Sequence, residues 1–113
     1  SEDVRAATGS AFEWRRLDRV AVAGREDSTL VVELLGESGD LDPALLRARD
    51  AYEQALDDYM AGHFETAVGG FRLAAILRPD DRAADMMARR AEALAREAPP
   101  ADWDGVFTQL AKL

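Results

Sequence analysis

The chain has no cysteine, and its 113 residues include a single lysine and a single histidine. Without cysteine, a disulfide, a thiolate nucleophile and a cysteine-built zinc site are excluded, and a cytoplasmic location is favoured. The histidine, His63, stands next to Gly62 in an expected turn, and no spacing supplies it with partner ligands. We therefore expect a structural role for His63, and neither a metal nor a cofactor.

Clustered positive charge and long apolar runs are also missing. Aspartate and glutamate number 22 against 14 lysines and arginines, so the net charge is −8. Nucleic acid is excluded as an expected partner, because phosphate backbones are bound by clustered Lys and Arg. No apolar run approaches the roughly 18 residues that cross a bilayer, so no membrane contact is expected. The chain begins at Ser1 without an initiator methionine, and we expect it to be part of a longer protein.

Apolar residues are nonetheless abundant enough for one compact core. Alternating and β-branched residues predict a β-hairpin with strands at about 12–23 and 29–35. Two strands alone are marginally stable in water, so the hairpin must lie on helices or belong to a larger sheet.

Helical periodicity begins after an acidic linker, where Asp42-Pro43 forms a strong helix start. Three helices are predicted, from Pro43 to a stop at Gly62, at about 64–77 and at about 81–96. The expected fold class is mainly α with a β-hairpin (α+β): a two-stranded antiparallel hairpin, a helix-turn-helix and a third, capping helix. The predicted segments are the hairpin, the linker, the helical unit and the tail, at residues 1–36, 37–42, 43–98 and 99–113.

Two smaller features carry packing predictions. Gly69-Gly70 lies inside a helix, where each glycine costs about 1 kcal/mol relative to alanine. We expect close approach of the first or third helix at this pair. In the tail, Trp103, Val106, Phe107 and Leu110 follow a helical stripe interrupted by Gly105, which predicts one or two helical turns packed on the helices through Trp103.

The helix-turn-helix resembles one tetratricopeptide repeat. The resemblance is specific in its second helix, which has the turn glycine, the aromatic, small residues and closing proline at Gly62, Phe64, Ala67, Phe71, Ala74 and Pro79. It is loose in the first helix, where Ala51 stands at the usual tryptophan position. A lone repeat leaves faces to be covered by the hairpin, the tail or a second chain. Such units bind partners through the inner face of the first helix, which makes the candidate interaction residues Arg49, Tyr52, Leu56, Tyr59 and Met60, with Trp103 as a further candidate. Because several of these also lie on the apolar stripe, core packing is the competing interpretation.

The N-terminal part resembles the last segment of a bacterial class III adenylate/guanylate cyclase catalytic domain. The matching segments are 1–4, 14–25 and 32–36, and the Pro-Pro-x-x-Trp-Asp-Gly-Val tail at 99–106 is similar to the ends of such cyclases that continue into tetratricopeptide units. The family's metal-binding aspartates and transition-state residues would lie upstream of Ser1, so no catalytic residue is expected here. Ala23 stands at the family's polyphosphate-binding lysine position, and Arg25 is a weak substitute.

The sequence therefore leads to two hypotheses. In the first, the chain is a non-catalytic C-terminal fragment of a class III nucleotide cyclase, a phosphorus-oxygen lyase. It would act in protein-protein contact, dimerisation or regulation of cyclic-nucleotide synthesis, with the rest of the parent cyclase or a second copy as its partner. In the second, it is a stand-alone adaptor resembling a tetratricopeptide unit and unrelated to cyclases. No constellation of residues supports an enzyme in its own right.

Overall fold

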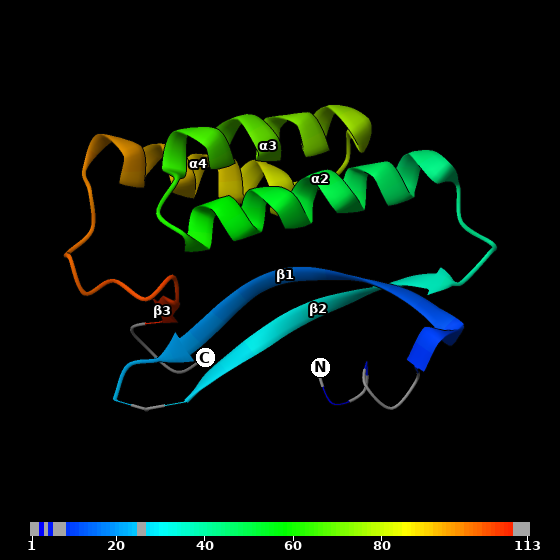
Figure 1. Ribbon diagram of the computed structural model, residues 1–113, viewed down its shortest axis with the longest axis horizontal. Helices are drawn as coiled ribbons and strands as arrows, with labels where there is room; N and C mark the ends of the chain where they lie inside the picture. Colours follow the sequence, from blue (N-terminus) through cyan, green and yellow to red (C-terminus); the bar gives the residue numbers. More distant parts are fainter. Residues whose placement is uncertain (1–2, 4, 6–8, 25–26, 110–113) are drawn as a thin grey trace. The chain divides into compact units, whose positions relative to one another are not determined.

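The computed structural model describes residues 3, 5, 9–24 and 27–109, and these fall into two compact units. Unit 1 comprises Ser1–Leu41 with Val106–Leu113, and unit 2 comprises Asp42–Gly105. Unit 1 contains the strands and unit 2 contains three α-helices (Figure 1). The predicted α+β fold class, a hairpin combined with three helices, is confirmed.

The hairpin of unit 1 is formed by β1 (Phe12–Val22), which follows the short 3-10 turn η1 (Gly9–Ala11), and β2 (Ser28–Glu37). The two strands are antiparallel, with Trp14 opposite Leu34, and their register shifts at two points along β1. Such bulges increase the local twist of a hairpin. β2 continues into the segment expected as a linker, where the amide of Ser38 still donates to the Ala11 carbonyl at 3.0 Å. The strands are thus formed close to where the alternation of residues predicts them.

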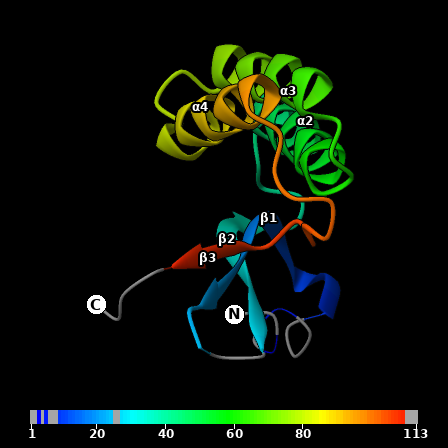
Figure 2. The ribbon, with the colours of Figure 1, turned by 90° about the vertical axis from the view of Figure 1, so that its left-hand side faces the viewer.

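A third strand, β3 (Phe107–Gln109), occupies the place where a helical tail was expected. β3 lies parallel to β1, with Phe107 opposite Val20, and the strand order is β2-β1-β3 (Figure 2). The expectation of helical turns was wrong, because Gly105 adopts φ +83°, outside the helical region, and the edge of β1 provides backbone partners for the residues that follow. The sheet therefore has one strand more than the expected hairpin; Leu110 lies outside the described residues.

Unit 2 consists of α2 (Pro43–Met60), α3 (Phe64–Leu77) and α4 (Arg82–Arg96), as the periodicity predicts. The Asp42 carboxylate accepts a hydrogen bond from the Ala44 amide at 2.8 Å and caps α2. Gly62 turns the chain between α2 and α3 at φ +85°, a backbone conformation that glycine adopts without strain. Local sequence signals therefore determine where α2 begins and where it ends.

The core of unit 2 is built from a few large side chains set among alanines. The largest fully buried side chains are Tyr52, Leu56, Tyr59, Phe71 and Met87. The small residues let the helices approach closely: a Cβ added at Gly70 would lie 2.7 Å from the Ala55 Cβ of α2, whereas one added at Gly69 would meet nothing within 4 Å. The expected close approach thus occurs at one glycine of the pair, against the first helix.

Candidate interaction surface

The predicted partner-binding face of α2 is largely core. Tyr52, Leu56 and Tyr59 are each at most 1% exposed. The Tyr52 ring meets the edge of Phe71, with centroids 5.1 Å apart. Edge-to-face aromatic pairs of this kind stabilise a core beyond the area that they bury. In this structure the three side chains hold α2 to its neighbours, and a partner has no access to them.

The two other candidates on α2 are partly accessible. The Arg49 guanidinium Nε lies 2.7 Å from Oδ1 of its neighbour Asp50, an ion pair near the surface. Met60 is half-buried at the end of α2, and a Cβ at Gly105 would come within 3.2 Å of its backbone. These two residues therefore do not form a continuous surface with the buried ones.

Trp103 closes an aromatic cluster within unit 2. Its ring lies 5.4 Å from that of Tyr59 and 5.2 Å from that of Phe64, both in edge-on geometry. The side chain is half-buried. These contacts support the interpretation of Trp103 as an anchor that holds the start of the tail against α2 and α3.

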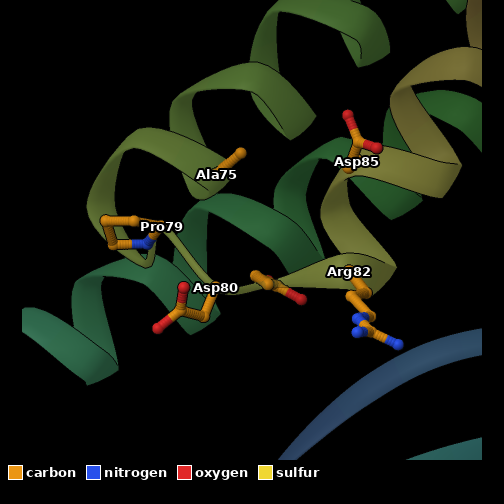
Figure 3. A pocket seen from close by; sticks show the side chains of 6 residues that line it. Ala75, Pro79, Asp80, Arg82 and Asp85 are labelled. Carbon is orange, nitrogen blue, oxygen red and sulfur yellow. The ribbon is translucent and has the colours of Figure 1, made fainter.

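An open hollow lies where α3 turns into α4 (Figure 3). It is lined by Ala75, Pro79, Asp80, Asp81, Arg82 and Asp85. Asp81 caps α4 by accepting a hydrogen bond from the Ala84 amide at 3.3 Å. Asp85 is paired with Arg72 at 3.6 Å and with Arg89 at 2.9 Å. Two of the three carboxylates in this hollow, Asp81 and Asp85, are therefore already bonded to groups of α3 and α4.

Exposed apolar side chains lie along the outer strand of the sheet, β2. β2 is bonded to β1 on one side, and in the part of the chain that the structure describes no strand lies on its other side. We call this open side, over residues 28–34, the β2 edge. Val31 is 36% exposed and Leu34 is 53% exposed. Because side chains alternate along a strand, these two residues present apolar surface on opposite faces of the sheet.

The one charged residue within the β2 edge is held inward. The Glu33 Oε1 lies 2.8 Å from both Nε and Nη2 of Arg15, which stands directly opposite it on β1. The Arg15 side chain is 3% exposed and that of Glu33 is 31% exposed. The negative charge of Glu33 is thus largely compensated within the hairpin. Sequence reasoning missed this edge, although the absence of lysine and proline from β2 is visible in the sequence.

Ala23, one of the two cyclase-like positions, and the histidine lie on the surface. Ala23 is exposed directly after β1, and Arg25 lies outside the described residues. His63 is exposed at the N-terminal end of α3, where its amide donates to the Asp58 carbonyl at 2.8 Å and its side chain makes no capping bond.

Among residues 3, 5, 9–24 and 27–109, no group of three or more His, Asp or Glu side chains is arranged to hold a metal ion. No helix in that part of the chain has the length and apolarity needed to cross a membrane. Comparisons with protein-family models, with curated proteins and with solved structures find no match to this chain.

Proposed function

We propose that this chain is the C-terminal, non-catalytic part of a bacterial class III nucleotide cyclase, and that it serves protein-protein contact and regulation of the parent enzyme in the cytoplasm. The observation that carries the proposal is the order of two structural elements. A β-hairpin built from the cyclase-like segments is followed by a helical hairpin with the features of a tetratricopeptide unit.

The hairpin supports the first part of this proposal, the origin of the chain in a class III nucleotide cyclase. The segments 14–25 and 32–36 that resemble the cyclase family contribute to β1 and β2, which pair over most of their length. A hairpin of this size is marginal alone, and β3 adds only three residues to it. Such a sheet is consistent with the outer strands of a larger catalytic sheet in which β2 remains the edge strand.

The helices support the second part of the proposal, a role in protein-protein contact. Three of the positions that carry the repeat-like pattern of α3, Ala67, Phe71 and Ala74, are fully buried. α3 packs against α2 on one side and α4 on the other. This is the arrangement in which one repeat is followed by a capping helix. Units of this kind have no chemistry of their own and bind other chains, which is why we assign contact and regulation to this part.

The proposal is tested by reading the gene upstream of the Ser1 codon and then assaying the encoded protein. We expect an upstream cyclase domain with its two metal-binding aspartates, in frame with this chain. The longer protein should convert ATP or GTP to a cyclic nucleotide with a divalent cation present, and removal of residues 43–98 should change its rate or its oligomeric state. A start codon directly before Ser1 would refute the proposal.

One observation favours the alternative, a stand-alone adaptor. Ala23, at the position of the family's lysine, offers no charge for a polyphosphate. If the upstream sequence encodes no cyclase domain, the helical unit would remain a contact module and the hairpin would resemble the family by coincidence. Pull-down with the isolated chain, followed by identification of bound proteins, then becomes the relevant experiment.

A further inference from the structure

The β2 edge has the properties of a strand that another strand can join. Its residues 28–34 are extended, and one side of the strand has no neighbouring strand in the described part of the chain. The backbone N–H and C=O groups on such a side form a row of donors and acceptors. A strand added there would satisfy that row by main-chain hydrogen bonds.

Lysine and proline, two of the devices that protect an open edge, are missing from these residues. Natural edge strands carry lysine, proline or outward charge that discourages pairing. The sequence of β2 is Ser-Thr-Leu-Val-Val-Glu-Leu-Leu-Gly-Glu, without lysine or proline. Its central charge, Glu33, is compensated by Arg15 at 2.8 Å. Val31 and Leu34 add exposed apolar surface on the two faces, so the edge favours association.

The order of side chains along β2 suits pairing with itself. In an antiparallel pair around a two-fold axis normal to the sheet, residues of the same face lie opposite each other. With Val31 on the axis, Val31 meets Val31, Leu30 meets Val32, and Thr29 meets Glu33. Each Glu33 carboxylate, which Arg15 of its own hairpin holds, then faces a neutral Thr29 and no like charge. Seven residues of each strand, 28–34, are paired in this register.

The neighbouring registers pair fewer residues or place like charges opposite each other. With Val32 on the axis, five residues of the β2 edge, 30–34, are paired in place of seven. With Glu33 on the axis, the two glutamates oppose each other directly, and with Leu30 on the axis, Asp27 opposes Glu33. The register with Val31 on the axis is the one that pairs seven residues and places no like charges opposite each other.

We infer that the β2 edge binds the same edge of a second copy of this chain, in antiparallel register with Val31 on the two-fold axis. The inference rests on the contact role proposed above and names its partner and surface. The dimer would join two sheets in the order β3-β1-β2-β2-β1-β3. With seven paired residues a side, its interface is smaller than that of a typical stable dimer, and we expect an equilibrium between monomer and dimer.

The test is light scattering of the whole 113-residue chain over a range of concentrations. The wild type should shift from monomer to dimer as concentration rises. Val31→Lys and Val31→Glu each place like charges opposite each other at the axis and should raise the dissociation constant about tenfold or more. An equimolar mixture of the two variants should restore the dimer, because Lys then faces Glu. The control is Ile76→Lys on α3, where Ile76 is 74% exposed, and it should dimerise like the wild type.

Each remaining outcome bears on the inference. A wild type that is monomeric at about 1 mM, dimers that persist in both Val31 variants, or a mixture that fails to dimerise would overturn it. Circular dichroism shows whether the variants are folded. If neither is, amide exchange in the wild type decides: protection of residues 28–34 must increase with concentration, and constant protection would refute pairing. A failed dimerisation test would not bear on whether a cyclase domain is encoded upstream, so the two proposals can be refuted separately.

Discussion

The adjacent glycines of α3 should respond oppositely to the same substitution. A Cβ at Gly70 would lie 2.7 Å from the Cβ and 3.3 Å from the Cα of Ala55, whereas a Cβ at Gly69 would meet nothing within 4 Å. Neither glycine has a positive φ, so alanine is compatible with the backbone at both positions. Gly69→Ala is therefore a matched control for Gly70→Ala.

The two substitutions share the gain in helix propensity, about 1 kcal/mol for Gly to Ala in a helix interior. Gly69→Ala should raise the free energy of unfolding by about that amount. Gly70→Ala adds an overlap with Ala55, whose contacting atoms belong to the backbone or to a Cβ that cannot rotate away. Because α2 and α3 must move apart, we expect an overpacking cost of about 1–3 kcal/mol. The difference between the two variants should equal this overpacking cost.

Urea denaturation followed by circular dichroism at 222 nm measures both variants, since the helical signal comes mainly from α2, α3 and α4. Equal midpoints for Gly69→Ala and Gly70→Ala would refute the close packing of α3 on α2. A second test uses Ala55→Gly, which removes the atom at 2.7 Å. Gly70→Ala should be less harmful in that background, with a coupling of about 1 kcal/mol or more.

Three further substitutions, one of them with a matched control, test the cap of α4 and the tail. Asp81→Ala removes the acceptor that caps α4 and should lower the free energy of unfolding by about 1 kcal/mol, whereas Asp80→Ala at the exposed neighbour should change it by less than about 0.5 kcal/mol in the same urea assay. Trp103→Ala removes a half-buried ring from the aromatic cluster and should cost about 2 kcal/mol; an unchanged thermal midpoint would contradict its role as an anchor. Gly105→Ala forces a side chain into φ +83° against the Met60 backbone at 3.2 Å, and should cost more than about 1 kcal/mol, measured by thermal denaturation.

The helices could be predicted because their signals are local. Asp42 followed by proline starts α2, Gly62 ends it, and Asp81 begins α4, each through atoms within a few residues of one another. The hairpin strands are likewise visible from alternation and β-branching. Capping and turn formation depend on neighbouring backbone groups, so a short window of sequence contains the physics that decides them.

The role of each candidate residue could not be predicted in the same way. Tyr52, Leu56 and Tyr59 satisfy both a partner-facing and a core-facing pattern, and only the packed structure shows them buried. Gly69 and Gly70 are indistinguishable in sequence, yet one contacts α2 and the other faces open space. Periodicity locates the apolar face of a helix, but the neighbour that covers it comes from elsewhere in the chain.

By itself, then, the sequence determined the helices, the hairpin and the absence of cysteine chemistry, because each of these depends on composition or on residues close together in the chain. The tertiary structure decided that residues 107–109 pair with β1 and that the inner face of α2 is core. It also decided that β2, among the described residues, pairs with β1 alone. These features depend on contacts between segments far apart in sequence, whose formation reflects the competition among all available partners in the folded chain.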